Sequence, residues 1–208
     1  MEIELDYELT EKIRHLVWRY QDKWGKELHR TDMVYCPVKA YCRLKGIKPK
    51  PKGRSLENWI IGEIGHALIQ RAFENVEVEK EYEGVVMHYD VVWDNMPMEI
   101  KTTVTGILHA AQIPDEYLEQ LTYGLVMSGD KEGLLLTFDL LNKLILVWRI
   151  KLSDDELEKA RRRFIKRKNL ILEAVKRNDP SILQPYYEEC SNCPYAYKPD
   201  GCPCYRGE

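Results

Sequence analysis

The 208-residue sequence lacks two features that would assign it to a class at once, a long apolar run and a strong net charge. No apolar stretch approaches the roughly 20 residues that a membrane-spanning helix needs. The opening segment, MEIELDYELTEK, is charged rather than signal-like. We therefore expect a cytoplasmic protein with no membrane partner. The net charge of −3 does not indicate nucleic-acid binding by the chain as a whole.

The sequence also lacks internal repeats and low-complexity tracts. Its length and its 44% hydrophobic residues suit one sizeable α/β domain with a real core. Basic residues do gather locally, in Lys45–Arg54 and in Arg161–Lys168. Either run could follow DNA phosphates, and either could be a solvated surface, so both interpretations stay open.

Six cysteines in a chain of this type favour metal binding over disulfides. Cys190 and Cys193 form a C-x-x-C pair, a spacing that lets two thiolates meet at one centre. Two more cysteines follow near the C-terminus and two lie early in the chain: Cys202, Cys204, Cys36 and Cys42. Four thiolates suit Zn²⁺ or an iron–sulfur cluster, and the spacing does not separate the two.

The stretch GVVMHYDVVWDNMPMEIKTT, residues 84–103, predicts a β-hairpin. We expect strands over Val85–Trp93 and Met98–Val104, joined by a turn over Asp94–Pro97. Glu99 and Lys101 are two apart and share a strand face, and Asp90 on the partner strand is expected across from them. Asp94 lies in the turn and is set aside. Two carboxylates with one ammonium predict a site for a hard divalent cation.

The flanking segments predict helices and further strands. Apolar spacing and end signals indicate helices over Leu9–His29, Pro37–Gly46, Pro114–Met127 and from Ser153 to Arg177, and one that begins at Ser55 and carries His66. Strands are expected over Val76–Tyr82, Leu134–Leu140 and Leu144–Ile150. Gly62 and Gly65 weaken the helix of His66 and indicate close approach of another element. The order of elements predicts an α/β fold with a mixed central sheet flanked by helices.

The order His66, Asp90, Glu99-x-Lys101 and Gln120-x-x-Tyr123 resembles the RecB-type branch of the PD-(D/E)xK nuclease superfamily. With the cysteines it is similar, over about residues 31–204, to the CRISPR-associated RecB-like exonucleases that contain an iron–sulfur cluster, the fourth-numbered Cas family. The resemblance implies a nuclease core over residues 55–178. An N-terminal helical segment, 1–54, and a cluster-binding tail, 179–208, would complete one compact domain.

The resemblance also implies roles for single residues. Asp90, Glu99, His66 and the Ile100 carbonyl would bind Mn²⁺ or Mg²⁺. Lys101 would orient the attacking water and stabilise charge in the transition state. Gln120 would add a hydrogen bond, and Tyr123 would guide the DNA strand, for instance by base stacking.

For the cysteines, the resemblance implies a cluster that joins the two ends of the chain, [4Fe–4S] in preference to [2Fe–2S]. Cys36, Cys190, Cys193 and Cys202 would be its ligands, and Cys204 competes with Cys202 as the fourth. Cys36 is favoured over Cys42 because the pair Cys36-Pro37 matches the family motif.

The implied activity is that of a metal-dependent exonuclease on single-stranded DNA, in the 5′ to 3′ direction. The implied pathway is prespacer processing alongside the CRISPR integrase complex. One alternative is a recombination or repair nuclease, including a viral one, outside CRISPR. Another is a non-catalytic DNA-binding module, which the presence of all six site residues disfavours. The oligomeric state stays open.

Overall fold

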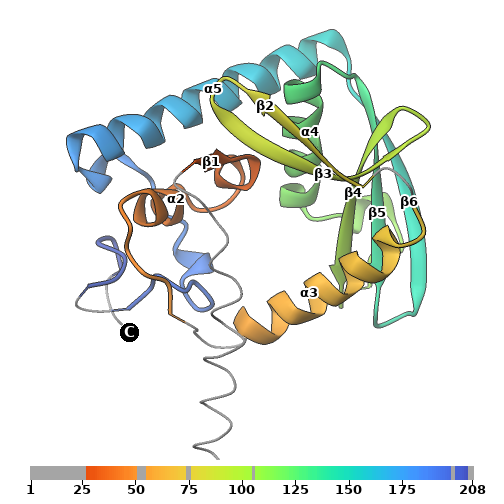
Figure 1. Cartoon of the computed structure of the whole chain (residues 1–208), viewed down its shortest axis with the longest axis horizontal. Coiled ribbons are helices and arrows are strands. Elements are labelled where there is room, and N and C mark those ends of the chain that lie inside the picture. The colour runs from red at the N-terminus through yellow and green to blue at the C-terminus, as the bar shows by residue number, and fades with distance from the viewer. Residues whose placement is uncertain (1–26, 51–54, 74–75, 105, 198–199, 206–208) are drawn as a thin grey trace, which may run out of the picture.

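The computed structural model describes residues 27–50, 55–73, 76–104, 106–197 and 200–205. A six-stranded mixed sheet forms its centre, in the order β1–β3–β4–β5–β6, and β2 pairs with β3 off this path (Figure 1). The strands are β1 Leu28–His29, β2 Val76–Tyr82, β3 Val85–Trp93, β4 Met96–Thr103, β5 Glu132–Asp139 and β6 Leu144–Lys151. This confirms the predicted α/β fold with a mixed sheet.

The described residues form four α-helices: α2 Pro37–Leu44, α3 Ser55–Gln70, α4 Asp115–Ser128 and α5 Asp154–Arg177. Short 3₁₀ helices are η2 Arg30–Met33, η3 Ala110–Gln112, η4 Pro180–Ile182 and η5 Tyr187–Glu189. Helix α4 packs on one face of the sheet, and α3 packs on the other against β3 and β4. Among the described residues, no helix combines the length and the apolar character needed to cross a membrane.

The sequence placed the start of α5 correctly. Ser153 caps this helix, since its side chain accepts a hydrogen bond from the Glu156 backbone while the Glu156 carboxylate accepts one from the Ser153 N–H. Such a reciprocal box satisfies two backbone donors that a helix start leaves unpaired. The capping box therefore fixes the start of the long basic helix directly after β6.

The hairpin of β3 and β4 has a shorter turn than predicted. Asp94 and Asn95 have φ values of 50° and 60°, so they make a two-residue turn of the kind that suits twisted strands. Met96 therefore already pairs with Trp93. The predicted turn over residues 94–97 was wrong in length, because Met96 and Pro97 belong to β4.

The end of the first predicted helix was also wrong. Residues 9–26 lie outside the described part, but Leu28 and His29 form β1, which pairs in parallel with Val85 and Val86. Leu28 is buried in the core. A buried apolar residue suits either a helix or a strand, and here the pairing with β3 makes it part of a strand.

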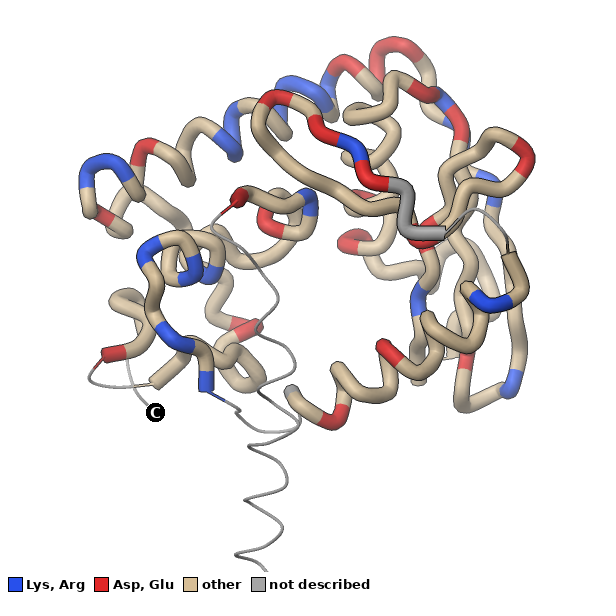
Figure 2. Tube along the Cα trace, viewed as in Figure 1, with Lys and Arg blue, Asp and Glu red and all other residues tan. Residues whose placement is uncertain are grey.

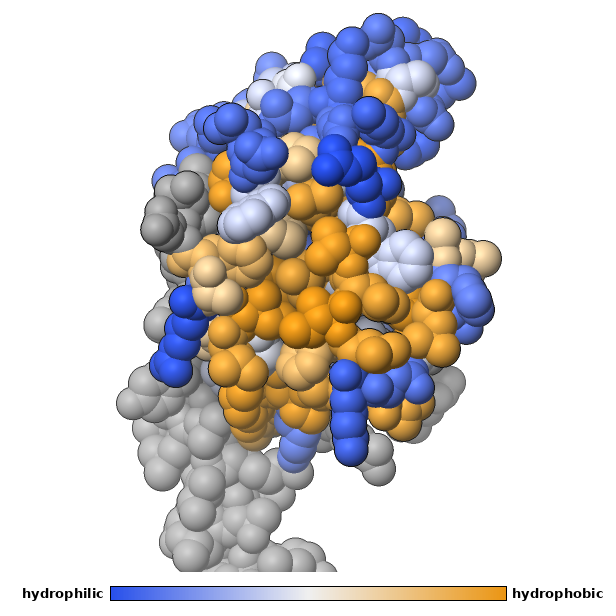
Figure 3. All heavy atoms as spheres, turned by 90° about the vertical axis from the view of Figure 1, so that its right-hand side faces the viewer, coloured by the Kyte–Doolittle hydropathy of each residue, from blue (hydrophilic) through white to orange (hydrophobic). Residues whose placement is uncertain are grey.

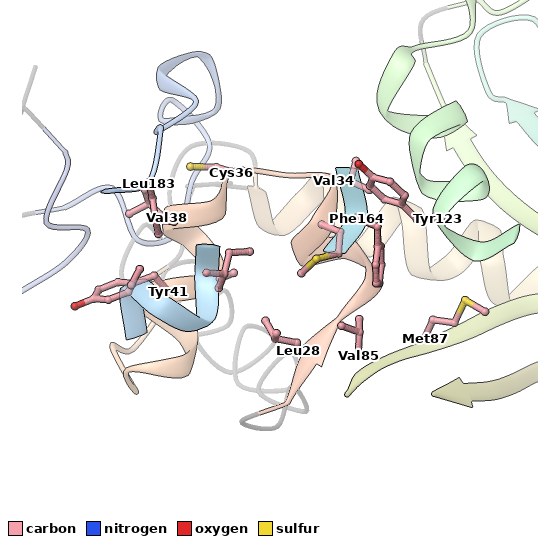
Figure 4. Packing of buried hydrophobic residues seen from close by; sticks show 14 of the residues in the cluster. Leu28, Val34, Cys36, Val38, Tyr41, Val85, Met87, Tyr123, Phe164 and Leu183 are labelled. Atoms are coloured by element: carbon pink, nitrogen blue, oxygen red, sulfur yellow. The ribbon is translucent and has the colours of Figure 1, made fainter. Parts of the chain in front are cut away.

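The largest apolar cluster joins segments that are distant in the sequence. It combines β1 and α2 with β3, α4, α5 and the residues after α5, as Figure 4 shows around Leu28, Val85, Phe164 and Leu183. Figure 1 likewise places α2 beside the C-terminal segment. The core therefore spans all three predicted segments, and the division at residues 54 and 178 stays a prediction.

Candidate active site

Asp90 lies at the junction of three elements, β3, β4 and α3. Its Oδ2 accepts a 2.7 Å hydrogen bond from the Ile100 N–H, and its Oδ1 lies 3.8 Å from Nδ1 of His66. The Asp90 carbonyl accepts a 3.0 Å hydrogen bond from the Gln70 side chain. The hairpin and α3 thus bring His66, Asp90 and Ile100 together, with the contact to Ile100 made by its N–H; metal binding by the Ile100 carbonyl stays a prediction.

Lys101 connects the hairpin to α4. Its Nζ donates to Glu99 Oε1 at 2.6 Å and to Gln120 Oε1 at 2.8 Å. It also lies 5.6 Å from the ring centroid of Tyr117. Glu99 is buried while Lys101 keeps some exposure, so the ammonium stands between the buried carboxylate and solvent. The structure therefore assembles five predicted side chains into one cluster: His66, Asp90, Glu99, Lys101 and Gln120.

Arg30 is a member of this cluster that the sequence analysis missed. Its Nη2 donates a 2.7 Å hydrogen bond to Glu99 Oε2 and another to the His88 carbonyl. Within the described residues its Nε and Nη1 have no hydrogen-bond partner. A Cβ at Gly124 would lie 2.8 Å from Nη1, so the glycine of α4 makes room for the guanidinium. The sequence offers only a general signal, that a buried carboxylate such as Glu99 needs a cation beside it. It does not indicate that this cation is Arg30.

The two carboxylates have opposite electrostatic environments. Burial and the nearby charge of Glu99 raise the pKa of Asp90 to about 7. Burial alone would also raise the pKa of Glu99, but the charges of Arg30 and Lys101 outweigh it and lower that pKa. One carboxylate therefore stays ionised while its neighbour titrates near neutral pH, a separation that is typical of reactive sites.

His66 is held close to the sheet by its helix. Burial, then the charge of Lys101, lower its pKa, so the imidazole is neutral near pH 7 and keeps a lone pair for a ligand. A Cβ at Gly65 would collide with Thr102 of β4, which confirms the close approach predicted from the glycines. A Cβ at Gly62 would have no neighbour within 4 Å among the described residues, so no element approaches the helix closely at Gly62.

Tyr123 does not join the cluster. Its ring packs edge-on against Phe164 with centroids 5.3 Å apart (Figure 4). Its hydroxyl donates a 2.6 Å hydrogen bond to Glu119. Only 1% of the residue is exposed. The predicted stacking of a DNA base on this ring conflicts with that burial, because no ring face is open to a strand.

No three His, Cys, Asp or Glu side chains of the described residues lie together as a ready-made metal site. The donor chemistry of the cluster nevertheless fits a divalent cation. Asp90 and Glu99 offer oxygen, and His66 offers a neutral nitrogen. A bound cation would favour the ionised form of Asp90, whose pKa is raised by burial first and by the charge of Glu99 second.

Five of the six cysteines line one pocket: Cys36, Cys190, Cys193, Cys202 and Cys204. Two hydrogen bonds join Cys36 to the late segment, since the Cys36 N–H donates to the Glu189 carboxylate and the Tyr186 N–H donates to Cys36 Sγ. No disulfide joins any two of the six cysteines, all of which lie in the described part of the chain. The arrangement brings an early cysteine to the late ones across the whole length of the chain.

Cys42 is set apart from this pocket. It is fully buried, does not line the pocket, and hydrogen-bonds with Cys202, which together with burial raises the pKa of its thiol. Cys202 and Cys204 both line the pocket. The choice between them as the fourth ligand stays open.

The two basic runs have structural contacts. In the first, the Lys50 N–H donates to the Pro194 carbonyl, and the Lys48 carbonyl accepts from Tyr197, so residues 48–50 hold the tail. In α5, Figure 2 shows acidic residues interleaved with basic ones. Arg162 pairs with Glu158, and the buried Lys168 with Glu83. DNA contact by either run stays a prediction.

No family model matches the chain, and no curated protein matches it. Solved structures do. SSO0001 aligns with a TM-score of 0.58 and 18% identity, over 93% of this chain and 97% of that one. An alkaline exonuclease from Laribacter hongkongensis, LHK-Exo, aligns with a TM-score of 0.53 and 13% identity, over 74% of this chain and 91% of its own. The same enzyme in complex with dAMP gives 0.54. The fold is thus an exonuclease-like α/β nuclease fold.

Proposed function

We propose that the chain is a metal-dependent exonuclease that degrades single-stranded DNA in the 5′ to 3′ direction. The observation that carries this proposal is the cluster of Asp90, Glu99 and Lys101 on one hairpin, completed by His66 and Gln120. The exonuclease-like fold supports it. LHK-Exo has been solved with dAMP, and a deoxynucleoside monophosphate is the type of product that an exonuclease releases.

In this proposal Asp90, Glu99, His66 and the Ile100 carbonyl hold Mn²⁺ or Mg²⁺. Such an ion, when bound, acidifies a water and neutralises charge on the phosphate. Lys101 orients that water and stabilises negative charge as it develops, because its ammonium is fixed by two hydrogen bonds and needs no reorganisation. Gln120 keeps the Lys101 side chain directed at the site.

The test is degradation of end-labelled single-stranded DNA with Mn²⁺. We expect cleavage that a chelator stops and that falls roughly 10²–10³-fold in Lys101→Ala. Lys159→Ala, an exposed lysine on α5, is the matched control and should retain full activity. The position of the label gives the polarity. A wild-type protein that binds the DNA but never cleaves it would favour the non-catalytic DNA-binding module.

We further propose that the cysteine pocket holds an iron–sulfur cluster of the [4Fe–4S] type. Cys36, Cys190, Cys193 and Cys202 would ligate it, with Cys204 as the competing fourth ligand. Thiolates of one cluster bind different iron atoms and stand farther apart than the ligands of one ion, which suits a pocket lined on several sides. A cluster there would clamp the tail to the segment of α2.

Iron and sulfide analysis after anaerobic purification tests the cluster. We expect roughly four irons per chain with visible absorbance, both lost in Cys193→Ser. Cys42→Ala, whose thiol does not line the pocket, should keep them. Zinc in place of iron would overturn the cluster and leave the nuclease proposal untouched.

For the pathway, we propose prespacer processing together with the CRISPR integrase complex, on the strength of the family resemblance. The second candidate is a recombination or repair nuclease outside CRISPR, which the similarity to the LHK-Exo fold favours. Pull-down with the integrase, compared with growth after DNA damage in a deletion strain, separates the two. Binding of the integrase supports the first, and damage sensitivity without such binding supports the second.

A further inference from the structure

Strand β6 is the last strand of the sheet, and within the described residues no strand pairs with its outer side. An unpaired edge leaves a row of backbone N–H and C=O groups that can pair with another chain. This edge carries apolar side chains as well, because Ile145 and Val147 are 59% and 56% exposed. The charged residues of this strand, Arg149 and Lys151, lie toward its C-terminal end and leave the apolar part near its start.

Helix α3 extends the apolar surface. Ile61, Ile64 and Leu68 recur at helical spacing, and all three are exposed, whereas Ile69 on the other side packs into the sheet. The helix therefore has one apolar stripe toward its own sheet and a second one facing outward.

The β6 edge and the α3 stripe lie on the same side of the sheet. Ile145 and Val147 pair across the ladder with Phe138 and Leu136, which share their face and pack with Ile69 of α3. Six large apolar side chains with at least 41% exposure belong to α3, to this face of β6 and to the turn before it: Ile61, Ile64, Leu68, Leu141, Ile145 and Val147. Figure 3 shows the apolar atoms gathered over this side of the molecule.

We propose that this surface is an interface between two copies of the chain. An apolar patch that holds many large side chains marks an interaction site. Homodimer interfaces are more apolar than transient ones, and this patch has that composition. Nucleic acid or an acidic peptide would need free cations here, but Arg149 and Lys151 of β6 already pair with Glu132 of the same chain.

The geometry of an edge strand suits self-association. Two β6 strands related by a two-fold axis perpendicular to the sheet run antiparallel, and their unpaired backbone groups satisfy each other. The same axis keeps the apolar faces of both copies on one side. Ile145 and Val147 of the two copies then meet in cross-strand contacts, and the α3 stripes flank them. One continuous sheet of two copies results.

Light scattering coupled to size-exclusion chromatography, over a range of micromolar concentrations, tests the interface. We expect twice the mass of the chain for the wild type and the mass of one chain for Val147→Lys. Leu172→Lys, an equally drastic change at an exposed leucine of α5, should stay dimeric. Hydrogen exchange of the β6 amides should slow as the wild-type concentration rises, which an association elsewhere would not produce.

Ile64→Lys on α3 provides a second variant, because an exposed helix position tolerates charge even if Val147→Lys does not fold. It should weaken the dimer at least tenfold in Kd. A wild type that stays monomeric throughout, or an assembly that survives both lysine substitutions unchanged, would overturn the proposal. Each mass is measured without DNA, so the outcome does not depend on nuclease activity.

Discussion

The carboxylate cluster and the cysteine pocket are built in opposite ways. Four members of the cluster lie on β3, β4 and α3, and its inner geometry depends on a hairpin whose strands follow one another directly. The cysteine pocket joins Cys36 to residues more than 150 positions away. One region rests on local pairing, and the other rests on the packing of the whole molecule.

The difference shows in what holds each region. Ladder hydrogen bonds fix the hairpin, whereas Arg167 of α5 holds the segment before Cys36 by donating to the Val34 carbonyl at 3.2 Å and to that of Tyr35. The same guanidinium donates to the Tyr186 hydroxyl of the tail at 2.6 Å. We therefore expect the two regions to respond independently to most substitutions, and Arg30 to be the exception that links them.

The largest expected effect lies in the carboxylate cluster alone. Asp90→Asn should lower metal-dependent cleavage by about 10³-fold, equivalent to about 4 kcal/mol, because an amide cannot replace a charged ligand. Iron content should not change. Asp94→Asn, in the turn of the same hairpin, is the matched control and should keep its activity. If Asp94→Asn lost cleavage in an end-label assay while Asp90→Asn kept it, the wrong aspartate would have been assigned.

Arg30→Met tests the link between the regions, since Arg30 belongs to the segment that continues into Cys36. The unfolding free energy in urea should fall by about 3 kcal/mol, because Glu99 would stay buried with one cation instead of two. Arg162→Met removes an exposed ion pair on α5 and should cost under about 1 kcal/mol. If both variants lost the same unfolding free energy, the buried Arg30–Glu99 pair would contribute no more to stability than the exposed one.

The pH dependence of stability sharpens the electrostatic contrast within the cluster. The pKa of Asp90 is raised to about 7, so its contribution to stability is fully present below its ordinary value and is lost as the pH rises through 7. Between about pH 5 and pH 8, metal-free wild type should lose about 2–3 kcal/mol relative to Asp90→Asn.

Urea titrations of both proteins at each pH give this difference, which includes the effect of Asp90 on its neighbour His66. Parallel curves for the two proteins would contradict the raised pKa. With Mn²⁺ present, cleavage by the wild type should increase through the same pH range, because the cation binds the ionised carboxylate.

The smallest expected effect concerns the core between the two regions. Tyr123→Phe keeps the ring on Phe164 and removes one hydrogen bond to Glu119, so stability should fall by about 1 kcal/mol. Cleavage should stay within about twofold of wild type. A tenfold loss of kcat at unchanged stability would instead restore the catalytic role that the sequence implied for this tyrosine.

The features that could be predicted from the sequence are those that depend on residues close to one another along the chain. Same-face spacing placed Glu99 and Lys101 together because that rule depends only on neighbours along one strand. Asp90 lies on the partner strand, one residue beyond the ladder pair of Val91 and Met98. The cap at Ser153 was predicted because a helix start likewise depends only on residues that are close in sequence. The motif Cys36-Pro37 suggested the early member of the pocket by resemblance alone.

Other features depend on contacts that no local rule contains. Arg30 reaches Glu99 across 69 positions, so its spacing gives no signal. Gln120 and Tyr123 share a helix face, but packing with Phe164 turns the tyrosine away from the cluster. Leu28 follows a helical apolar pattern and still pairs as a strand, because β3 offers it a partner. The unpaired edge of β6 emerges only from the strand order.

The distance in sequence between Cys36 and the late cysteines also sets an order of events during synthesis. The chain leaves the ribosome from its N-terminus, so the hairpin can pair while Cys190 and those after it are not yet made. Cys36 therefore has none of the late cysteines beside it until the segment of Cys190–Cys204 has been made and has docked. An inorganic centre that uses the late cysteines can therefore be delivered only after they have been made, and a product that stops before Cys190 would carry the hairpin with an incomplete pocket.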